Sequence, residues 1–245
     1  MVNKQRGFTL VEIAIVLVII GLLLGGILKG QELITAARVR NLADQSAGVQ
    51  AAYYGFIDRY RAVPGDMLAT QSCNAIGTEV PNCPGAGVGG VGPQGGNGQI
   101  DSVNWNEAAA AWAHMAAAGF LQGRYPGTAT ATTYGAAPTP AAPTNPWNGF
   151  LLLGRTANYM NVAANPPPRL HLIIGRNVPV NIMRELDVKV DDSFPQTGIL
   201  RSAPATATGF PTVGGSDATC VDTKPTPMIW NIAANPTDCN GYFLY

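Results

Sequence analysis

The hydrophobic pattern of the chain begins with one long apolar block near the N-terminus. A short basic leader runs to Gly7, and the 21 residues from Phe8 to Leu28 carry a single charge, at Glu12. In a helix that rises about 1.5 Å per residue, this block is roughly 31 Å long, which is enough to cross the hydrocarbon core of a bilayer. The block therefore predicts a membrane-spanning helix with one acidic residue near its start.

A periodic apolar stripe extends this helix beyond the block. Apolar residues recur at spacings of three and four as far as Tyr60, with charged residues between them. Pro64 disfavours a helical Val63 and starts a Pro-Gly-Asp turn, so we expect the helix to end near Arg61. The stripe consists of Leu33, Ala37, Leu42, Val49, Ala52, Tyr53, Phe56, Ile57 and Tyr60.

The pattern after this helix predicts a globular α+β head with a small antiparallel sheet. One helix is expected after an N-cap at Asn106, closed by Gly119, and another begins near Asn177 and Pro179. Short apolar runs predict strands at Phe150–Leu153, Leu170–Ile174, Ile199–Leu200, Met228–Ile232 and Tyr242–Tyr245.

Two stretches of the head are expected to lack regular structure. Residues 70–104 are predicted to be loops, and their Gly-rich part contains a G-x-G-x-x-G match without a preceding strand or a following helix. A nucleotide site is therefore not indicated there. Residues 126–146 are rich in Pro, Ala and Thr, a composition that predicts an extended, exposed spacer.

The motif R-G-F-T-L-V-E, which ends at Glu12, resembles the processing site of type IV prepilins and of type II secretion pseudopilins. The resemblance is tight over residues 1–30 and looser as far as Arg61. It implies that a prepilin peptidase cuts after Gly7 and methylates the new N-terminus at Phe8. It also implies that Glu12 pairs with the terminal amine of a neighbouring subunit, since each charge then offsets the other's desolvation. Such a pair would set the axial register of subunits.

Three alternatives for this segment stay open. A cleaved secretory signal usually has a shorter apolar region and an A-x-A-like cut site, which this block lacks apart from a weak match near Ala37. A plain signal anchor explains the length but gives Glu12 no role. After cleavage, the Phe8 amine and Glu12 would also lie about one helical turn apart, roughly 6 Å along the axis, so they could pair within one chain.

Charge distribution predicts the topology of the chain in a membrane. Basic residues precede the apolar block, which places the leader in the cytoplasm and the bulk of the chain outside. We therefore expect a single-pass protein of the bacterial inner membrane with its C-terminus in the periplasm, in contact with lipid before it enters a filament. The 15 basic and 15 acidic residues balance, so no nucleic-acid partner is indicated.

Four cysteines fit export to an oxidising compartment. Four cysteines allow three connectivities, and we favour the local pairs because each closes a short loop. The spacings do not resemble a zinc site, since no C-x-x-C occurs and the chain has two histidines. The favoured pairs are Cys73–Cys83 and Cys220–Cys239. A disulfide-closed C-terminal loop also resembles the variable loop of type IV pilins.

The predicted helix after Pro179 ends in acidic residues. Negative charge at a helix C-terminus interacts unfavourably with the helix dipole, so the presence of these residues requires an explanation. Asp187, Asp191 and Asp192 lie there. In one interpretation, Asp191 or Asp192 caps free backbone groups of a turn. In the other, the three carboxylates hold a calcium ion. Some secretion pseudopilins bind calcium, but the match here is in composition and does not follow their calcium motif.

No arrangement of residues indicates an active site, so we expect a structural protein with no catalytic residues and no cofactor, unless the three carboxylates hold that calcium ion. The domains predicted are a leader (1–7), a spine helix (8–63, with 8–28 in the membrane) and a periplasmic head (64–245), a pilin-like α+β fold. The expected function is a minor or specialised subunit of a type IV pilus or type II secretion pseudopilus. Its partners would be prepilin peptidase, other subunits and the inner-membrane assembly platform. The alternative is an anchored periplasmic binding or adhesion domain that never polymerises.

Overall fold

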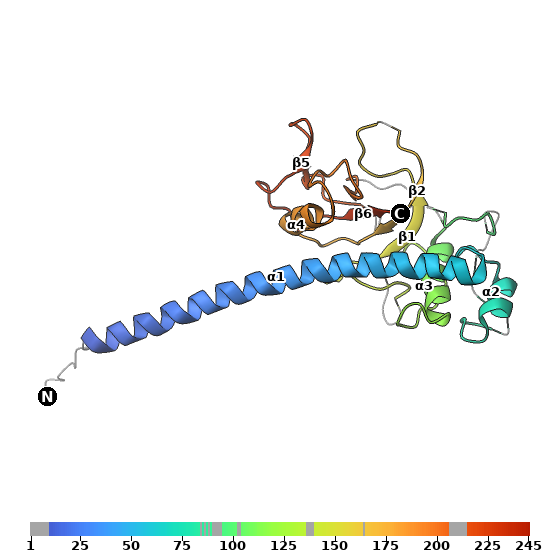
Figure 1. The fold of residues 1–245 in the computed structure, drawn as a ribbon, viewed down its shortest axis with the longest axis horizontal. Coiled ribbons are helices and arrows are strands. Elements are labelled where there is room, and N and C mark those ends of the chain that lie inside the picture. Colours follow the sequence, from blue (N-terminus) through green and yellow to red (C-terminus); the bar gives the residue numbers. More distant parts are fainter. Residues whose placement is uncertain are drawn as a thin grey trace. The chain divides into compact units, whose positions relative to one another are not determined.

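The computed structural model of the protein describes residues 10–83, 85, 87, 89, 95–101, 104–135, 140–163, 165–205 and 215–245. The chain divides into two compact units, Met1–Arg40 and Asn41–Tyr245, and each is described by itself. In chain order (Figure 1), the elements are α1 (Leu10–Tyr60), α2 (Ala69–Ile76), α3 (Trp105–Ala117), β1 (Leu152–Thr156), β2 (Arg169–Ile173), α4 (Val180–Val190), β3 (Leu200–Ser202), β4 (Val221–Asp222), β5 (Ile229–Trp230) and β6 (Gly241–Leu244).

The long first helix confirms the expectation from the apolar period. α1 contains 51 residues and ends at Tyr60, one residue before the position that Pro64 indicated. Arg61 follows with a positive φ of 53°, a conformation that no regular helix continues. The fold is thus α+β, with a long N-terminal apolar helix followed by a C-terminal domain that contains a small antiparallel sheet.

The main sheet has four antiparallel strands in the order β1-β2-β6-β3. Its register aligns one apolar row across all four strands, because Leu153 pairs with Leu172, Leu172 with Phe243, and Phe243 with Leu200. All four side chains are buried. Cross-strand apolar pairs of this kind are the main source of stability in a sheet. The register thus fixes which residues face the core of the head.

Helices supply the rest of the core of the second unit. Leu42 and Phe56, on the part of α1 that belongs to this unit, are buried, as is Trp112 on α3, which packs against β1. The hydroxyl of Tyr245 donates to the backbone oxygen of Ser46 at 2.9 Å, so the last residue of the chain is tied to α1. The head therefore closes on the second half of α1.

Two local expectations are wrong, and one strand was not predicted. The N-cap of α3 is Asn104 and not Asn106, because the Asn104 side chain accepts from the N–H of Glu107 at 3.3 Å. Residues 70–104 were expected to be loops, but Ala69–Ile76 form α2. The strand β4 was not predicted, since two residues paired with two others leave no period to detect. Gly119, by contrast, follows the C-cap with a φ of 81°, as its expected C′ role requires.

The Pro-, Ala- and Thr-rich stretch 126–146 is not an exposed spacer. Within its described part, Ala129, Tyr134, Ala141 and Ala142 are buried. The Tyr134 hydroxyl accepts from Trp112 Nε1 at 2.7 Å and donates to the backbone oxygen of Leu151 at 3.0 Å. Small side chains allow the backbone to lie close to the core, so composition alone did not indicate burial here.

The two histidines are both buried but differ in their bonding. Nδ1 of His114 accepts from the N–H of Gly65 at 3.0 Å, which agrees with the expected structural role. His171, in β2, is 0% exposed, and neither ring nitrogen meets hydrogen-bond geometry with a described residue, although the backbone of Arg169 acts to raise its pKa. Its ring lies 4.8 Å from that of Tyr159 and 5.5 Å from that of Tyr242. Burial lowers the pKa of His171 to about 4, and the charges of Arg169 and Arg201 act in the same direction.

We predict that His171 makes the head acid-sensitive. Because the pKa of His171 in the folded state lies below the value near 6.5 in the unfolded chain, the unfolded chain binds the proton more tightly. The contribution of His171 to stability should therefore fall as the pH drops from about 6.5 to about 4, by up to roughly 3 kcal/mol relative to a variant without the imidazole, while the raised pKa of Asp187 acts in the opposite direction in both proteins. The replacement His171→Leu should remove this contribution. Urea unfolding of both proteins across this pH range measures the difference, and parallel stability curves would contradict the prediction.

Candidate functional site

The first half of α1 exposes a continuous apolar surface. All 14 large apolar side chains between Leu10 and Leu28 are between 45% and 90% exposed. The helix is long and apolar enough to cross a membrane, and no part of its most apolar 18-residue window is buried. Covering each large apolar side chain stabilises by about 1.5–3 kcal/mol, so this surface leaves tens of kcal/mol to be gained from lipid or another protein.

The predicted processing and assembly residues lie at the start of this surface. Glu12 is exposed in the first turn of α1, where a carboxylate interacts favourably with the helix dipole. Gly7 and Phe8 lie outside the described residues, so the cleavage position stays a prediction. Glu12 is the single charged residue in the described part of the apolar block, from Leu10 to Leu28.

Two disulfides stabilise the head, and they are the two pairs that short loop lengths favoured. Cys73 and Cys83 are bridged with their Cα atoms 5.6 Å apart, and Cys220 and Cys239 with theirs 5.8 Å apart. Cys73 lies within α2 and not in an irregular loop, which corrects that part of the argument. The second bridge closes a segment that contains β4 and β5.

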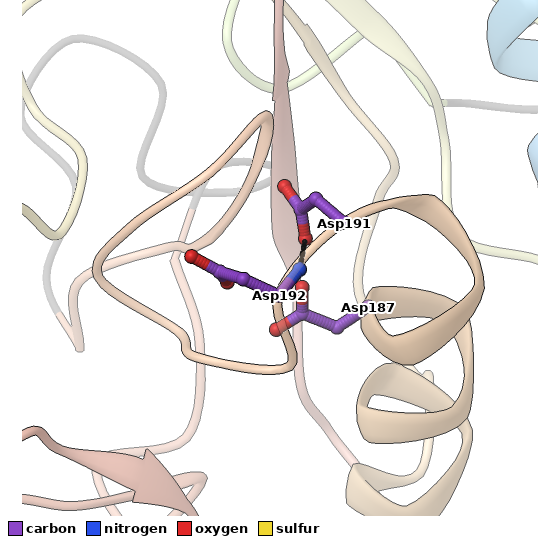
Figure 2. A group of neighbouring side chains, drawn as sticks. All are labelled: Asp187, Asp191 and Asp192. Atoms are coloured by element: carbon purple, nitrogen blue, oxygen red, sulfur yellow. Dashed lines mark hydrogen bonds between the residues drawn. The ribbon is translucent and has the colours of Figure 1, made fainter.

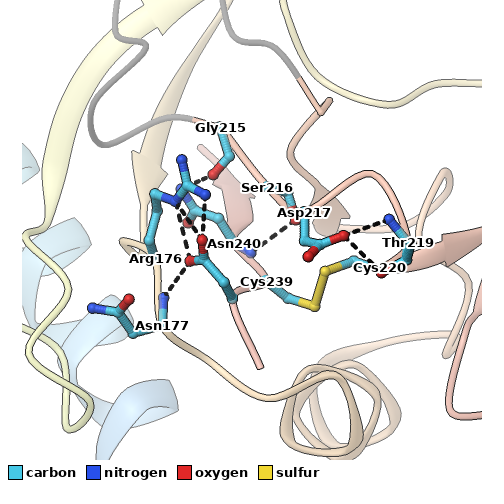
Figure 3. Close-up of polar contacts among 10 residues, drawn as sticks. Arg176, Asn177, Gly215, Ser216, Asp217, Thr219, Cys220, Cys239 and Asn240 are labelled. Carbon is cyan, nitrogen blue, oxygen red and sulfur yellow. Dashed lines mark hydrogen bonds and ion pairs between the residues drawn. A yellow bond between two sulfur atoms is a disulfide. The ribbon is translucent and has the colours of Figure 1, made fainter. Parts of the chain in front are cut away.

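A polar network beside Cys239 fixes the base of this C-terminal loop (Figure 3). The guanidinium of Arg176 forms an ion pair with Asp238, in which Nε lies 3.0 Å from both carboxylate oxygens. The N–H of Asn177 also donates to Asp238, and these bonds hold the pKa of Asp238 below its usual range. On the other side of Cys239, the N–H of Asn240 donates to the Ser216 hydroxyl at 3.2 Å. Sequence reasoning missed this network because its partners lie far apart in the chain.

The three carboxylates at the end of α4 come together as the sequence suggested (Figure 2). Asp187, Asp191 and Asp192 each place one oxygen within 4.8 Å of the others. Asp191 accepts from the N–H groups of Asp192, Ile199 and Leu200. This is the turn-capping role expected for these residues, and it links the end of α4 to the start of β3.

The local environment shifts the pKa values of Asp187 and Asp191 in opposite directions. Burial raises the pKa of Asp187 to about 8, and the neighbouring Asp191 acts in the same direction. Burial alone would also raise the pKa of Asp191, but the hydrogen bonds it accepts outweigh that effect and lower it. Asp187 thus holds a proton more tightly than Asp191, with which it shares a side-chain hydrogen bond. Hard cations prefer such oxygen ligands, so the cluster is the part of the described head best suited to hold a metal ion.

Comparison with known proteins identifies the N-terminal segment. Residues 2–28 match the family model described as the prokaryotic N-terminal methylation motif. This motif is characteristic of type IV prepilins and pseudopilins. The match covers the leader and the apolar block but none of the head. No curated protein and no solved structure matches the chain.

The motif indicates the class of protein in which such an exposed apolar helix occurs. It implies processing by a prepilin peptidase and assembly with other pilin subunits. It also points to a structural subunit rather than an enzyme, and it fits a membrane-anchored pilin. The α+β architecture with a long N-terminal helix and two disulfides is pilin-like as well.

We predict that the second disulfide is needed for a stable head. Replacement of both Cys220 and Cys239 by Ala should lower the free energy of unfolding by about 2–4 kcal/mol, because the unfolded chain gains freedom when the loop is opened. Urea unfolding under non-reducing conditions measures the change. The wild-type protein in reductant should show a comparable or larger loss, since both bridges open. An unchanged midpoint and slope in the double variant would contradict the prediction.

Proposed function

We propose that this protein is a subunit of a filament of the type IV pilus or type II secretion pseudopilus class. The observation that carries the proposal is the coincidence of the methylation motif with the exposed apolar half of α1. One segment thus contains both the signal for processing and a surface that must be covered by apolar groups. In this proposal the protein is a minor or specialised subunit, and the head of about 180 residues favours that role.

The sequence of events starts in the inner membrane. Prepilin peptidase cuts between Gly7 and Phe8 on the cytoplasmic side and methylates the amine of Phe8. The head lies in the periplasm, where its two disulfides form. The assembly platform then moves the chain from lipid into the filament. Both environments are apolar, so α1 stays covered throughout the transfer.

Glu12 is the residue that distinguishes assembly from simple anchoring. In lipid, a carboxylate at this depth is unfavourable by up to about 2.5–3.5 kcal/mol. In the filament, the amine of Phe8 on a neighbouring subunit would neutralise it, and each charge would offset the desolvation of the other. Because the pair forms at one axial offset only, it would also select the register between subunits.

A second candidate function is a membrane-anchored periplasmic domain that binds a ligand or a surface and never polymerises. The exposed apolar segment alone would suit such an anchor equally well. This candidate gives no role to Glu12 or to removal of the leader, so the two experiments below separate the two functions.

The first experiment concerns processing. Intact-mass spectrometry of the protein from cells that contain the peptidase should give the mass of a chain that starts at methylated Phe8. The replacement Gly7→Leu should leave the leader attached, because the peptidase requires a small residue at the cut. A mature chain that still starts at Met1, or that is cut near Ala37, would refute the proposed processing.

The second experiment concerns assembly. The replacement Glu12→Ala should keep or raise the amount of protein in the membrane fraction, since a charge leaves the apolar block. It should reduce the yield in sheared filaments at least tenfold. Glu32→Ala is the matched control, because Glu32 lies on the same helix outside the apolar block and pairs at 2.7 Å with Lys29. Normal incorporation of the Glu12 variant would remove the role assigned to this residue.

A further inference from the structure

A surface cavity of about 340 Å³ lies in the head where the loop after α2 meets α3. The two helices lie side by side (Figure 1). The cavity is lined by residues 78–83, by residues 123–125 and by three alanines of α3, Ala113, Ala116 and Ala117. Its volume falls within the range of small-ligand sites, about 300–1,000 Å³. Its lining contains no residue of α1, so the cavity is separate from the apolar surface that processing and assembly concern.

Two charged residues of opposite sign line this cavity. Glu79 is the only Asp, Glu, Lys or Arg between residues 67 and 100, and Arg124 is the only one between residues 108 and 154. Both are exposed, and within the described parts of the chain neither forms an ion pair with the other or with any third group. Two long stretches with one charge each thus bring both charges to one cavity and leave them available to a ligand.

The backbone at Glu79 is held in place by its neighbours. Glu79 lies in the loop that the Cys73–Cys83 disulfide closes. The next residue, Val80, is 1% exposed and packs against Ala113 of α3. The carboxylate therefore projects from a fixed point at the edge of the cavity, which reduces the entropy that binding would cost.

The backbone at Arg124 is held in a similar way. The next residue, Tyr125, is half-buried, and its ring lies 6.5 Å from that of Trp112 on α3. The hydroxyl of Tyr125 also donates to the backbone oxygen of Gln122 at 3.3 Å. Both charged side chains thus project from segments that are anchored on α3.

We propose that this cavity binds a short peptide with free ends and small side chains, with its ammonium group at Glu79 and its carboxylate at Arg124. A guanidinium presents a planar fork of donors that matches a carboxylate, and a carboxylate accepts from an ammonium group. Capture of peptide termini by such groups is a recurring mode of recognition.

The lining also decides which zwitterion fits best. Glu79 and Arg124 do not pair with each other across the cavity, so a ligand that reaches both must carry its two charges at separate ends. A free amino acid carries both on one carbon, whereas a peptide of two or three residues separates them. The three alanines end at Cβ, which leaves room beside α3 for a peptide backbone with small side chains. The proposal does not depend on whether the protein polymerises.

The experiment uses the full chain in detergent and trialanine with free ends. We expect saturable binding in a ligand-detected NMR titration, with a dissociation constant of about 0.1–1 mM, as ordinary ligand efficiency gives for a ligand of this size. Acetylation of the peptide amine or amidation of its carboxylate should each weaken binding about three- to tenfold, because one charge-assisted contact is lost. A single alanine should bind more weakly than trialanine.

Two variants assign the ends of the peptide. Glu79→Gln should bind free and acetylated trialanine equally, and Arg124→Gln should bind free and amidated trialanine equally. Glu185→Gln and Arg169→Gln are the controls, because these residues carry the same charges in the head but do not line the cavity. Both controls should discriminate as the wild-type protein does.

The replaced side chains are exposed, so the variants should fold, and an unchanged Tm verifies this. No saturable binding by the folded wild-type protein up to about 10 mM trialanine, ten times the weakest affinity expected, would overturn the proposal. Equal binding of free and blocked peptides by the wild-type protein would also overturn it, as would a single alanine that binds as tightly as trialanine.

Discussion

The first half of α1 exposes an apolar surface that must be covered, and this constraint decides what the N-terminal segment can do. Fourteen large apolar side chains in this segment are at least 45% exposed, and the described residues contain nothing that buries them. In water such a surface would drive aggregation, so the segment must lie in lipid or against other apolar helices. A chain that moves from lipid into contact with other apolar helices would keep this surface covered in both places. The head then needs to supply only solubility and a folded surface.

The head has its own apolar core and its own cross-links. Its sheet aligns Leu153, Leu172, Phe243 and Leu200 in one buried row, and the second half of α1 contributes Leu42 and Phe56 to the core. One disulfide links α2 to the segment after it, and the other disulfide and the Arg176–Asp238 pair hold the C-terminal segment that contains β4 and β5. With charged residues at only 12% of the chain, covalent and polar links stand in for surface ion pairs.

The sequence predicted the features that depend on a repeating pattern or on short separations. The period of α1, its end before Pro64 and the two local disulfides could all be inferred. Contacts between distant residues could not. The side chain of Asp187 is bonded to Trp230, 43 residues later, and the buried Tyr134 is bonded to Trp112. Asn145 is a further example. Its side-chain amide donates to the carbonyls of Ile174 and Arg176, and nothing in its local sequence indicates these bonds.

The central claim is that the apolar half of α1 is covered by other helices of the same class once the leader has been removed. A photo-reactive amino acid placed at Leu17, inside the apolar block, tests this claim in living cells. We expect crosslinks to filament subunits in cells with the peptidase, and crosslinks to lipid alone in cells without it. Crosslinks to lipid alone in both kinds of cell would contradict the account, because α1 would then be a membrane anchor and nothing more.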